Sequence, residues 1–506
     1  MINVDGLSLT IDKALLVMEK GETVKLDPEA KKRVQVNRDY LEKRLAGDEV
    51  IYGINTGFGH LSRISISPNE SDVLQRNLLL SHAAGFGPDL EESAVRGVML
   101  LRANALALGN SGVRPGVIEQ IIGFLNHKIH PRIPAQGSVG ASGDLAPLAH
   151  MSLALIGEGE VYFQGQIMPS SEAMEKTGLK PLQLKAKEGL ALINGTQVMA
   201  ALGILGLARG WRLIQQADVI AALSWEGLRG LGDAFDPLIQ RARPHPGQQN
   251  VAQNLRKLIE GSENLTDNME DKVQDAYTLR CIPQVHGASR NALEHLQEIL
   301  LCEINSATDN PLIFHEEDRI ISGGNFHGQP LALPLDYVGM ALAEIGNFSE
   351  RRIERLVNPA LSGLPPFLVE NSGLNSGYMV IQYTAASLVS ENKVLAGPAS
   401  IDSIPTSANQ EDHVSMGTIA ARKLDQINTN LAGILAIEAL CACQAVELAG
   451  ISRLGRGTEK MYNYLREKVP HLNTDRQLST EIQVVAELLR EGNILQILEE
   501  ARCGLE

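Results

Sequence analysis

Long runs of apolar residues at helical spacing constrain the fold of this chain more than any other feature of its sequence. Between residues 331 and 356, apolar side chains recur every three or four positions, at Leu331, Leu335, Val338, Ala341 and Ile345. Asn358 and Pro359 then stop this pattern, because proline cannot continue a helix. Residues 378–395 and 414–448 show similar periodicity. The sequence therefore predicts a mainly α fold, in which residues 201–506 form a bundle of long, nearly antiparallel helices.

Two short β-hairpins interrupt the helical pattern. Residues 161–168 are predicted to form strands that turn at Gln164 and Gly165, and residues 312–321 to form strands that turn around residues 316–318. Before residue 200, Gly and Pro are more frequent, notably in residues 53–59 and 131–143. This composition predicts loops and shorter helices, on which catalytic residues are common. We therefore expect residues 1–200 to form an N-terminal catalytic region.

Composition and charge exclude several classes of partner. The net charge is -15 at pH 7 and the hydrophobic fraction is 44%, which indicates a globular protein with a large core and no general affinity for nucleic acid or anionic lipid. No secretion signal is recognisable at Met1–Asp5, so we expect the protein in the cytoplasm. The most apolar stretch, residues 431–451, contains Glu438, Gln444 and Glu447, which favours a helix buried in protein over one that spans a membrane.

The cysteines and most of the histidines carry no recognisable metal site. The five cysteines are scattered and odd in number, which indicates reduced thiols. Cys441 and Cys443 lie two positions apart on the apolar helix, where a core role is favoured. His127 and His130 could meet on a helix, but no third ligand lies nearby, so we expect no metal.

A Gly-rich run at residues 137–150 carries the triplet Ala141, Ser142 and Gly143. Asp144 after it can cap a helix, and Pro147 is tolerated only in a first turn. A phosphate-binding loop is excluded, because the Lys followed by Ser or Thr that would complete it is absent. On these residues alone, a plain loop at the start of a helix remains open.

The triplet also has the composition needed to form an electrophile. If the amide nitrogen of Gly143 attacks the carbonyl carbon of Ala141, loss of water, including the Ser142 hydroxyl, leaves a five-membered ring with an exocyclic methylene. The small residues Ala141 and Gly143 permit the tight backbone approach that this closure needs.

The sequence resembles the aromatic amino acid ammonia-lyase family over nearly its whole length. Six further segments match that family in chain order: YGINTGFG at 52–59, LQRNLLLSHAAG at 74–85, EGLALINGTQ at 188–197, QDAYTLRCIPQVHG at 274–287, SGGNFH at 322–327 and TSANQEDHVSMG at 406–417. The resemblance implies a helical core of the ammonia-lyase and fumarase type. It also implies that residues 141–143 form 4-methylideneimidazole-5-one (MIO) autocatalytically, with no external cofactor.

The resemblance also assigns catalytic and substrate-binding roles to individual residues. Tyr52 matches a tyrosine that takes the β-proton, and Tyr277 matches a second tyrosine that orients the amine or shuttles a proton. Asn194 is implied to contact the ring and the substrate carboxylate, and Arg280 to grip that carboxylate with its planar fork. The remaining implied substrate-binding residues are Gln274 and Phe326. If their segment is helical, Gln274, Tyr277 and Arg280 share one face.

Three positions indicate which substrate the site accepts. The pair Ser81 and His82 is that of histidine-specific members, and Glu411 stands where the phenylalanine and tyrosine enzymes have glutamine. A carboxylate and an imidazole can together hold an imidazole ring, whereas an unpaired buried carboxylate beside a benzene ring is costly. We therefore expect elimination of ammonia from L-histidine to give trans-urocanate, the first step of histidine degradation.

Two alternatives remain open. The first is an MIO-dependent lyase or aminomutase that acts on another aromatic amino acid, and the second is an inactive helical scaffold without the ring. The resemblance further implies a homotetramer whose active sites draw residues from more than one subunit. The apolar helix faces suit burial between chains.

Overall fold

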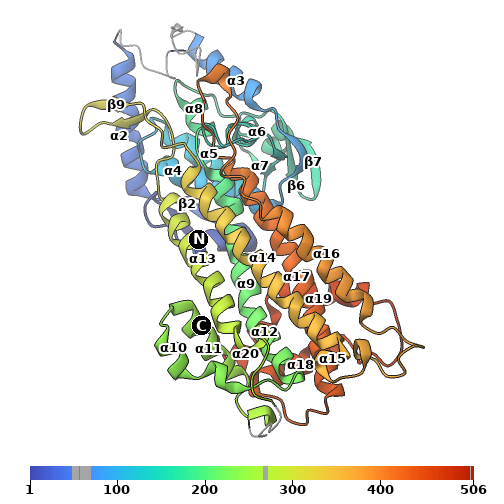
Figure 1. Ribbon diagram of the computed structural model, residues 1–506. Coiled ribbons are helices and arrows are strands. Elements are labelled where there is room, and N and C mark those ends of the chain that lie inside the picture. Colours follow the sequence, from blue (N-terminus) through green and yellow to red (C-terminus); the bar gives the residue numbers. More distant parts are fainter. Residues whose placement is uncertain (48–55, 57–69, 266–271, 502, 506) are drawn as a thin grey trace. The chain divides into compact units, whose positions relative to one another are not determined.

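The computed structural model describes residues 1–47, 56, 70–265, 272–501 and 503–505 (Figure 1). The chain forms two compact units. Unit 1 comprises Met1–Leu205, Leu296–Asp336 and Pro398–Arg422, and unit 2 comprises Gly206–His295, Tyr337–Gly397 and Lys423–Glu506. The boundary expected at residue 200 lies near the end of the first segment of unit 1, and two later segments join that unit. That residues 1–200 form the catalytic region stays a prediction.

The three long helices expected from apolar periodicity are present as α14 (Gln329–Val357), α16 (Met379–Leu395) and α17 (Gly417–Leu448). Two more long helices, α9 (Gln197–Gly227) and α13 (Ile282–Glu303), accompany them, and the mainly α fold is confirmed. Helix α14 ends before Asn358, as predicted. Helix α17 begins three residues later than expected, because Met416 has φ 52° and is not helical.

Within unit 2, small residues let these helices pack closely. A Cβ added at Gly210 would lie 3.1 Å from side-chain carbons of both Leu293 and Leu342, so glycine sets the distance between α9, α13 and α14 there. Arg352 and Glu438 form a fully buried ion pair at 2.6 Å between α14 and α17. Although α17 is long and apolar enough to cross a membrane, 83% of its most apolar window is buried in the protein. This confirms the prediction of a core helix.

Shorter helices make up much of unit 1, and standard caps fix several of their ends. The Thr10 hydroxyl accepts a hydrogen bond from the Lys13 amide at the start of α1, and the Asp27 carboxylate caps α2. The helices are α1 (Ile11–Lys20), α2 (Pro28–Leu45), α3 (Ser71–His82), α4 (Glu92–Ala107), α5 (Pro115–Asn126), α6 (Leu145–Leu155), α7 (Ser170–Thr177) and α8 (Glu188–Ile193).

Unit 2 contains further short helices beside the long ones. They are α10 (Pro237–Ala242), α11 (Pro246–Leu258), α12 (Tyr277–Arg280), α15 (Pro359–Ser362), α18 (Arg456–Lys468), α19 (Ser479–Glu491) and α20 (Asn493–Glu500). Apolar residues of α11, α18, α19 and α20 are buried, so these helices enlarge the core of this unit.

Both predicted hairpins are confirmed. β6 (Glu160–Phe163) pairs antiparallel with β7 (Gln166–Pro169) around a turn in which Gln164 and Gly165 have positive φ. β8 (Leu312–Phe314) pairs antiparallel with β9 (Arg319–Ile321). The sequence did not reveal that β4 (His130–Pro131) adds a third strand beside β6, nor the pairs β1 (Ile2–Val4) with β2 (Val24–Leu26) and β3 (Phe86–Asp89) with β5 (Pro134–Gln136).

Candidate active site

The triplet lies in unit 1, in the loop between β5 and α6, where it faces the loop between α8 and α9. Gly143 and Gly195 form a parallel bridge, and the Asp144 amide donates to the Gly195 carbonyl at 2.7 Å. Gly143 has φ 72°, and a Cβ there would lie 2.1 Å from the Gly195 oxygen. Only glycine therefore permits this approach, which holds the triplet against residues 194–196.

Asp144 organises the same region, but not as the sequence suggested. Its side chain makes no capping hydrogen bond to α6. Instead, one carboxylate oxygen accepts from the Val198 and Met199 amides at 2.9 Å each, which caps α9. The other oxygen accepts from the hydroxyls of Ser138 and Thr418. Complete burial raises the pKa of Asp144, and these hydrogen bonds oppose that rise.

Asn194 contacts the triplet directly. It follows α8 in extended conformation, and its Nδ2 donates to the Ser142 carbonyl at 2.9 Å. Asn194 is buried, and its Oδ1 has no hydrogen-bond partner among the described residues. A buried amide that polarises the Ser142 carbonyl and leaves an acceptor unused can contact both the triplet and a ligand.

Glu411 reaches the triplet from a distant segment of unit 1. Its Oε1 accepts from the Ser142 hydroxyl at 2.9 Å, and its Oε2 accepts from the Thr406 hydroxyl at 2.7 Å. Backbone hydrogen bonds between Thr406 and Glu411 close the loop that carries both residues. The structure thus brings Glu411 to the triplet, as the substrate prediction requires.

His82 ends α3 in the same unit, and its burial favours the neutral form of the ring. Nδ1 lies 2.9 Å from the Leu78 carbonyl; because a carbonyl only accepts, Nδ1 carries the proton and Nε2 is the acceptor. Burial lowers the pKa of His82, while the Leu78 hydrogen bond and the Glu411 charge oppose this shift. A neutral imidazole and a carboxylate are therefore available near the triplet.

The other expected site residues fall in different parts of the chain. Phe326 lies half-buried in the unit 1 loop before α14. Tyr277 and Arg280 lie in α12 of unit 2, where the Arg280 guanidinium carbon sits 4.6 Å from the Tyr277 ring centroid. Helix α12 begins at Tyr277, so Gln274 precedes it and does not share a helical face with the other two, contrary to expectation. Tyr52 lies outside the described residues.

Comparison with known proteins shows which family the chain belongs to. Residues 9–467 match the aromatic amino acid lyase family. The chain belongs to that family. It is 54% identical over 499 residues to a protein from Alkaliphilus metalliredigens named histidine ammonia-lyase, covering 99% of this chain and 98% of that one.

Solved structures of aromatic amino acid lyases share the fold. Histidine ammonia-lyase from Trypanosoma cruzi is 43% identical, with a TM-score of 0.91 and coverage of 99% of this chain and 96% of the other. Tyrosine aminomutase from Streptomyces globisporus is 39% identical, with a TM-score of 0.95 and coverage of 99% and 98%. Since a lyase and an aminomutase both match so closely, backbone similarity alone does not distinguish their reactions.

Sequence reasoning missed several residues that lie in, or contact, the segments that carry the candidate site. His327 and His413 stack at 5.2 Å between ring centroids, with Nε2 of the first 3.1 Å from Nδ1 of the second. Both lie inside family-matching segments, which was a usable signal. Arg102 donates to the Ala191 and Asn194 carbonyls from the middle of α4. No motif marks Arg102, so only the structure reveals its position.

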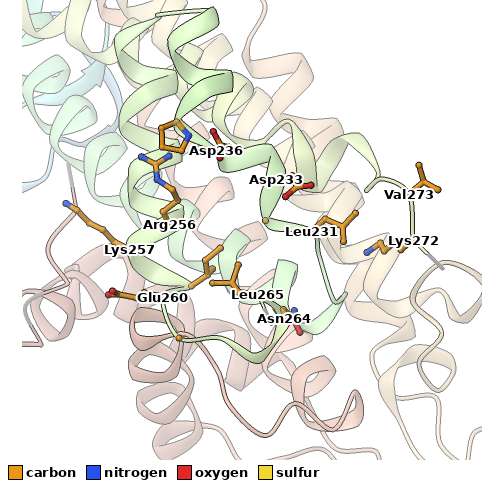
Figure 2. Close-up of a pocket in the computed structure, with 14 residues that line it drawn as sticks. Leu231, Asp233, Asp236, Arg256, Lys257, Glu260, Asn264, Leu265, Lys272 and Val273 are labelled. Atoms are coloured by element: carbon orange, nitrogen blue, oxygen red, sulfur yellow. The ribbon is translucent and has the colours of Figure 1, made fainter. Parts of the chain in front are cut away.

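A separate pocket of about 790 Å³ lies in unit 2 of this lyase (Figure 2). Side chains of both charge signs line it, among them Asp233, Arg256, Glu260 and Lys272. Arg256 donates to the Phe235 carbonyl and Lys272 to the Leu228 and Arg229 carbonyls, so these two cations already have partners. None of the residues expected at the active site lines this pocket.

Proposed function

We propose that this lyase eliminates ammonia from L-histidine without oxidation, giving trans-urocanate, as the first step of histidine degradation. The observation that carries the proposal is the contact between Glu411 and Ser142, beside which His82 supplies a neutral imidazole. A carboxylate and an imidazole acceptor can bind both nitrogens of an imidazole ring, whereas a benzene ring offers no donor to Glu411 Oε1. The relatives named histidine ammonia-lyase support the same substrate.

We propose that Ala141, Ser142 and Gly143 cyclise to MIO. The surroundings of the triplet fit this group: Gly143 has positive φ in close contact with Gly195, and Asn194 donates to the Ser142 carbonyl, which becomes the ring carbonyl. When formed, the ring supplies an electrophilic methylene for the substrate amine. Cyclisation also removes the Ser142 hydroxyl, so Glu411 Oε1 loses that donor and becomes available to the substrate.

The chain's own side chains then bind and orient the substrate. Thr406 fixes one carboxylate oxygen of Glu411, which leaves the other to accept from a substrate imidazole N–H. The protonated Nδ1 of His82 is held by the Leu78 carbonyl, so its Nε2 can accept a second N–H. Because the enzyme offers two acceptors, it favours the protonated imidazolium form of the substrate side chain. The positive charge of the imidazolium makes the β-proton of the substrate more acidic by induction.

The remaining roles follow the family resemblance. Tyr52 takes the β-proton, which requires support for its phenolate because an ordinary phenol has a pKa of about 10. Arg280 binds the substrate carboxylate with two parallel hydrogen bonds, and its contact with Tyr277 orients both side chains. Tyr277 then orients the amine, Gln274 adds a polar contact, and Phe326 packs against the ring. The leaving amine departs as ammonia while the electron pair of the β-carbon forms the double bond.

We further propose that the enzyme is a cytoplasmic homotetramer with active sites shared between subunits. Exposed apolar side chains on the long helices support an assembled state, among them Tyr337 and Met340 on α14 and Val380, Tyr383 and Val394 on α16. Burial of these side chains between chains would remove apolar surface from water.

Offering L-histidine, L-tyrosine and L-phenylalanine separately tests the function. Turnover of L-histidine with stoichiometric release of ammonia and the ultraviolet band of urocanate is the expected result. Faster turnover of either other amino acid, or formation of a β-amino acid without ammonia, would reject the proposal in favour of another lyase or an aminomutase.

A further inference from the structure

Arg102 is a buried cation beside the candidate site that none of the proposed catalytic steps uses. It lies on α4, and its side chain is completely buried. Its Nη1 donates to the Ala191 carbonyl at 3.0 Å and to the Asn194 carbonyl at 2.6 Å. Ala191 is in the last turn of α8, where backbone carbonyls lack helical partners and attract cations. Arg102 therefore fixes the end of this helix and the residue after it.

That connection leads directly to the triplet. The Asn194 carbonyl belongs to the peptide that joins Asn194 to Gly195. On one side of this peptide, the Asn194 side chain donates to the Ser142 carbonyl. On the other side, Gly195 pairs with Gly143 and accepts from the Asp144 amide. One guanidinium nitrogen of Arg102 thus orients the Asn194–Gly195 peptide. The residues on both sides of this peptide contact the triplet.

The surroundings of Arg102 show that its charge is poorly compensated. The nearest acidic groups, Asp309 and Asp144, act on it only through space. Lys187 binds Asp309 at 2.8 and 2.9 Å, and the Asp144 oxygens are occupied by hydroxyl and amide donors. Among the described residues, Nε and Nη2 of Arg102 have no hydrogen-bond partner.

An uncompensated buried cation is destabilising, so its presence calls for a reason other than stability. Burial lowers the pKa of Arg102 to about 10, which leaves the guanidinium charged at neutral pH. Its charge strengthens the two hydrogen bonds that it does make, since charged donors bind carbonyls more strongly than neutral ones. We therefore attribute the role of Arg102 to the two hydrogen bonds that its Nη1 donates to the Ala191 and Asn194 carbonyls.

We propose that Arg102 is a positioning residue that holds the Asn194–Gly195 peptide against residues 141–143 in the geometry that permits their cyclisation. This inference rests on the proposed formation of MIO. In that step, a bond forms between the Gly143 nitrogen and the Ala141 carbonyl carbon. The former carbonyl oxygen leaves as water with the Gly143 and Ser142 amide protons, and the Ser142 hydroxyl leaves as a second water with the Cα proton. No oxidant or reductant is needed.

Arg96 provides a matched control on the same helix. It is also buried, and it also donates to backbone carbonyls, those of Val17 at 2.7 Å and Leu125 at 3.3 Å. Burial lowers the pKa of Arg96 as well. Its backbone partners belong to α1 and α5, and its Nη1 also lies 3.3 Å from His130 Nε2. Arg96 therefore matches Arg102 in burial and in donating to backbone carbonyls, but none of these contacts leads to the triplet.

The experiment compares the wild-type chain with Arg102→Met, Arg102→Lys and Arg96→Met. Intact-mass measurement during expression and after purification gives the fraction of chains that have lost two waters, and thermal unfolding gives stability. Small misplacements of reacting groups slow a reaction by up to about 10²-fold. We therefore expect Arg102→Met to cyclise more slowly, and its cyclised fraction at a given time during expression to be lower by about tenfold or more. Arg102→Lys should cyclise slowly, since an ammonium keeps the charge but cannot reproduce the fork.

Arg96→Met should cyclise fully even where its melting temperature falls as far as that of the Arg102 variants. Complete loss of two waters at the wild-type rate in folded Arg102→Lys or Arg102→Met would overturn the inference. If Arg102→Met does not fold, the rate of Arg102→Lys decides. A wild-type chain without the mass loss would instead reject the proposed MIO itself, so the two failures are distinguishable.

Discussion

Ser142 donates its hydroxyl hydrogen bond to Glu411 at 2.9 Å across a separation of 269 residues. This contact joins the residue that is proposed to lose its hydroxyl to the residue that is proposed to select the substrate. Cyclisation would therefore remove a donor from Glu411 at the moment when the electrophile forms. Formation of the prosthetic group and opening of the substrate site would be one event.

Glu411→Gln should lower turnover of L-histidine by about 10-fold to 100-fold, the range expected when a charged hydrogen-bond partner worth about 1.5 to 3 kcal/mol is replaced. Thr406 can still bind the amide, so the melting temperature should change little. Steady-state kinetics with thermal unfolding check this, and Asp412→Asn at the exposed neighbouring residue is the control. An unchanged rate with a markedly lower melting temperature would assign Glu411 a structural role only.

Gly195→Ala should prevent cyclisation. Gly195 has φ 147°, which residues with a Cβ rarely adopt, and a Cβ there would lie 2.5 Å from Gln197 Oε1 and 2.8 Å from Thr308 Oγ1. We therefore expect the Asn194–Gly195 peptide to shift relative to the triplet. Gly178→Ala is the control, because Gly178 also has positive φ but faces open space and should lose only about 1 to 2 kcal/mol of stability. Intact mass checks both variants, and a fully cyclised Gly195→Ala chain would show that this contact is dispensable.

Stability should decrease as the pH falls from about 6.5 to 4. Burial lowers the pKa of His130 to about 4, whereas a histidine in the unfolded chain has a pKa of about 6.5. Between these values the unfolded state binds the proton and the folded state does not, so the free energy of unfolding falls with pH. The pKa values of His82 and His286 are also lowered by burial and act in the same direction.

Urea unfolding across this pH range measures the effect. His130→Gln should flatten the dependence by about 1 to 3 kcal/mol over the window, whereas substitution of the exposed His245 by Gln should leave it unchanged. Parallel curves for His130→Gln and the wild-type chain would show that His130 does not contribute.

Mixing two inactive variants tests whether active sites are shared. If Ser142 and Arg280 of one site come from different chains, Ser142→Ala and Arg280→Ala should rescue each other when refolded together, because some mixed sites contain both native residues. In Arg280→Ala, loss of the charged contact to the substrate carboxylate should cost roughly 1.5 to 3 kcal/mol. The residual activity of this variant alone should therefore be low. Activity no higher than the sum of the separate variants, with subunit exchange shown by tagging, would reject sharing for this pair.

The long helices and hairpins were predictable because periodicity and turn residues are local signals. Asn358 and Pro359 marked the end of α14, and the turn residues Gln164 and Gly165 marked the first hairpin. Asn194 and Glu411, the two expected site residues that the structure brings into contact with the triplet, both lie in family motifs. Arg102 and the capping of α9 by Asp144 were not predictable, because each depends on which backbone groups the fold brings to one side chain, and neither leaves a pattern in the sequence. Tyr52 lies outside the described residues, so its role stays a prediction.

The mass of the peptide that contains Ser142 tests the central claim most directly. We expect the wild-type peptide to be lighter than its sequence by two waters, and the Ser142→Ala chain to keep its fold, lack the ring and fail to convert L-histidine. Ser152→Ala, which removes another buried hydroxyl of unit 1, should keep both the mass loss and the turnover. An unmodified wild-type peptide in a preparation that releases ammonia from L-histidine, or substantial turnover by Ser142→Ala, would contradict the account.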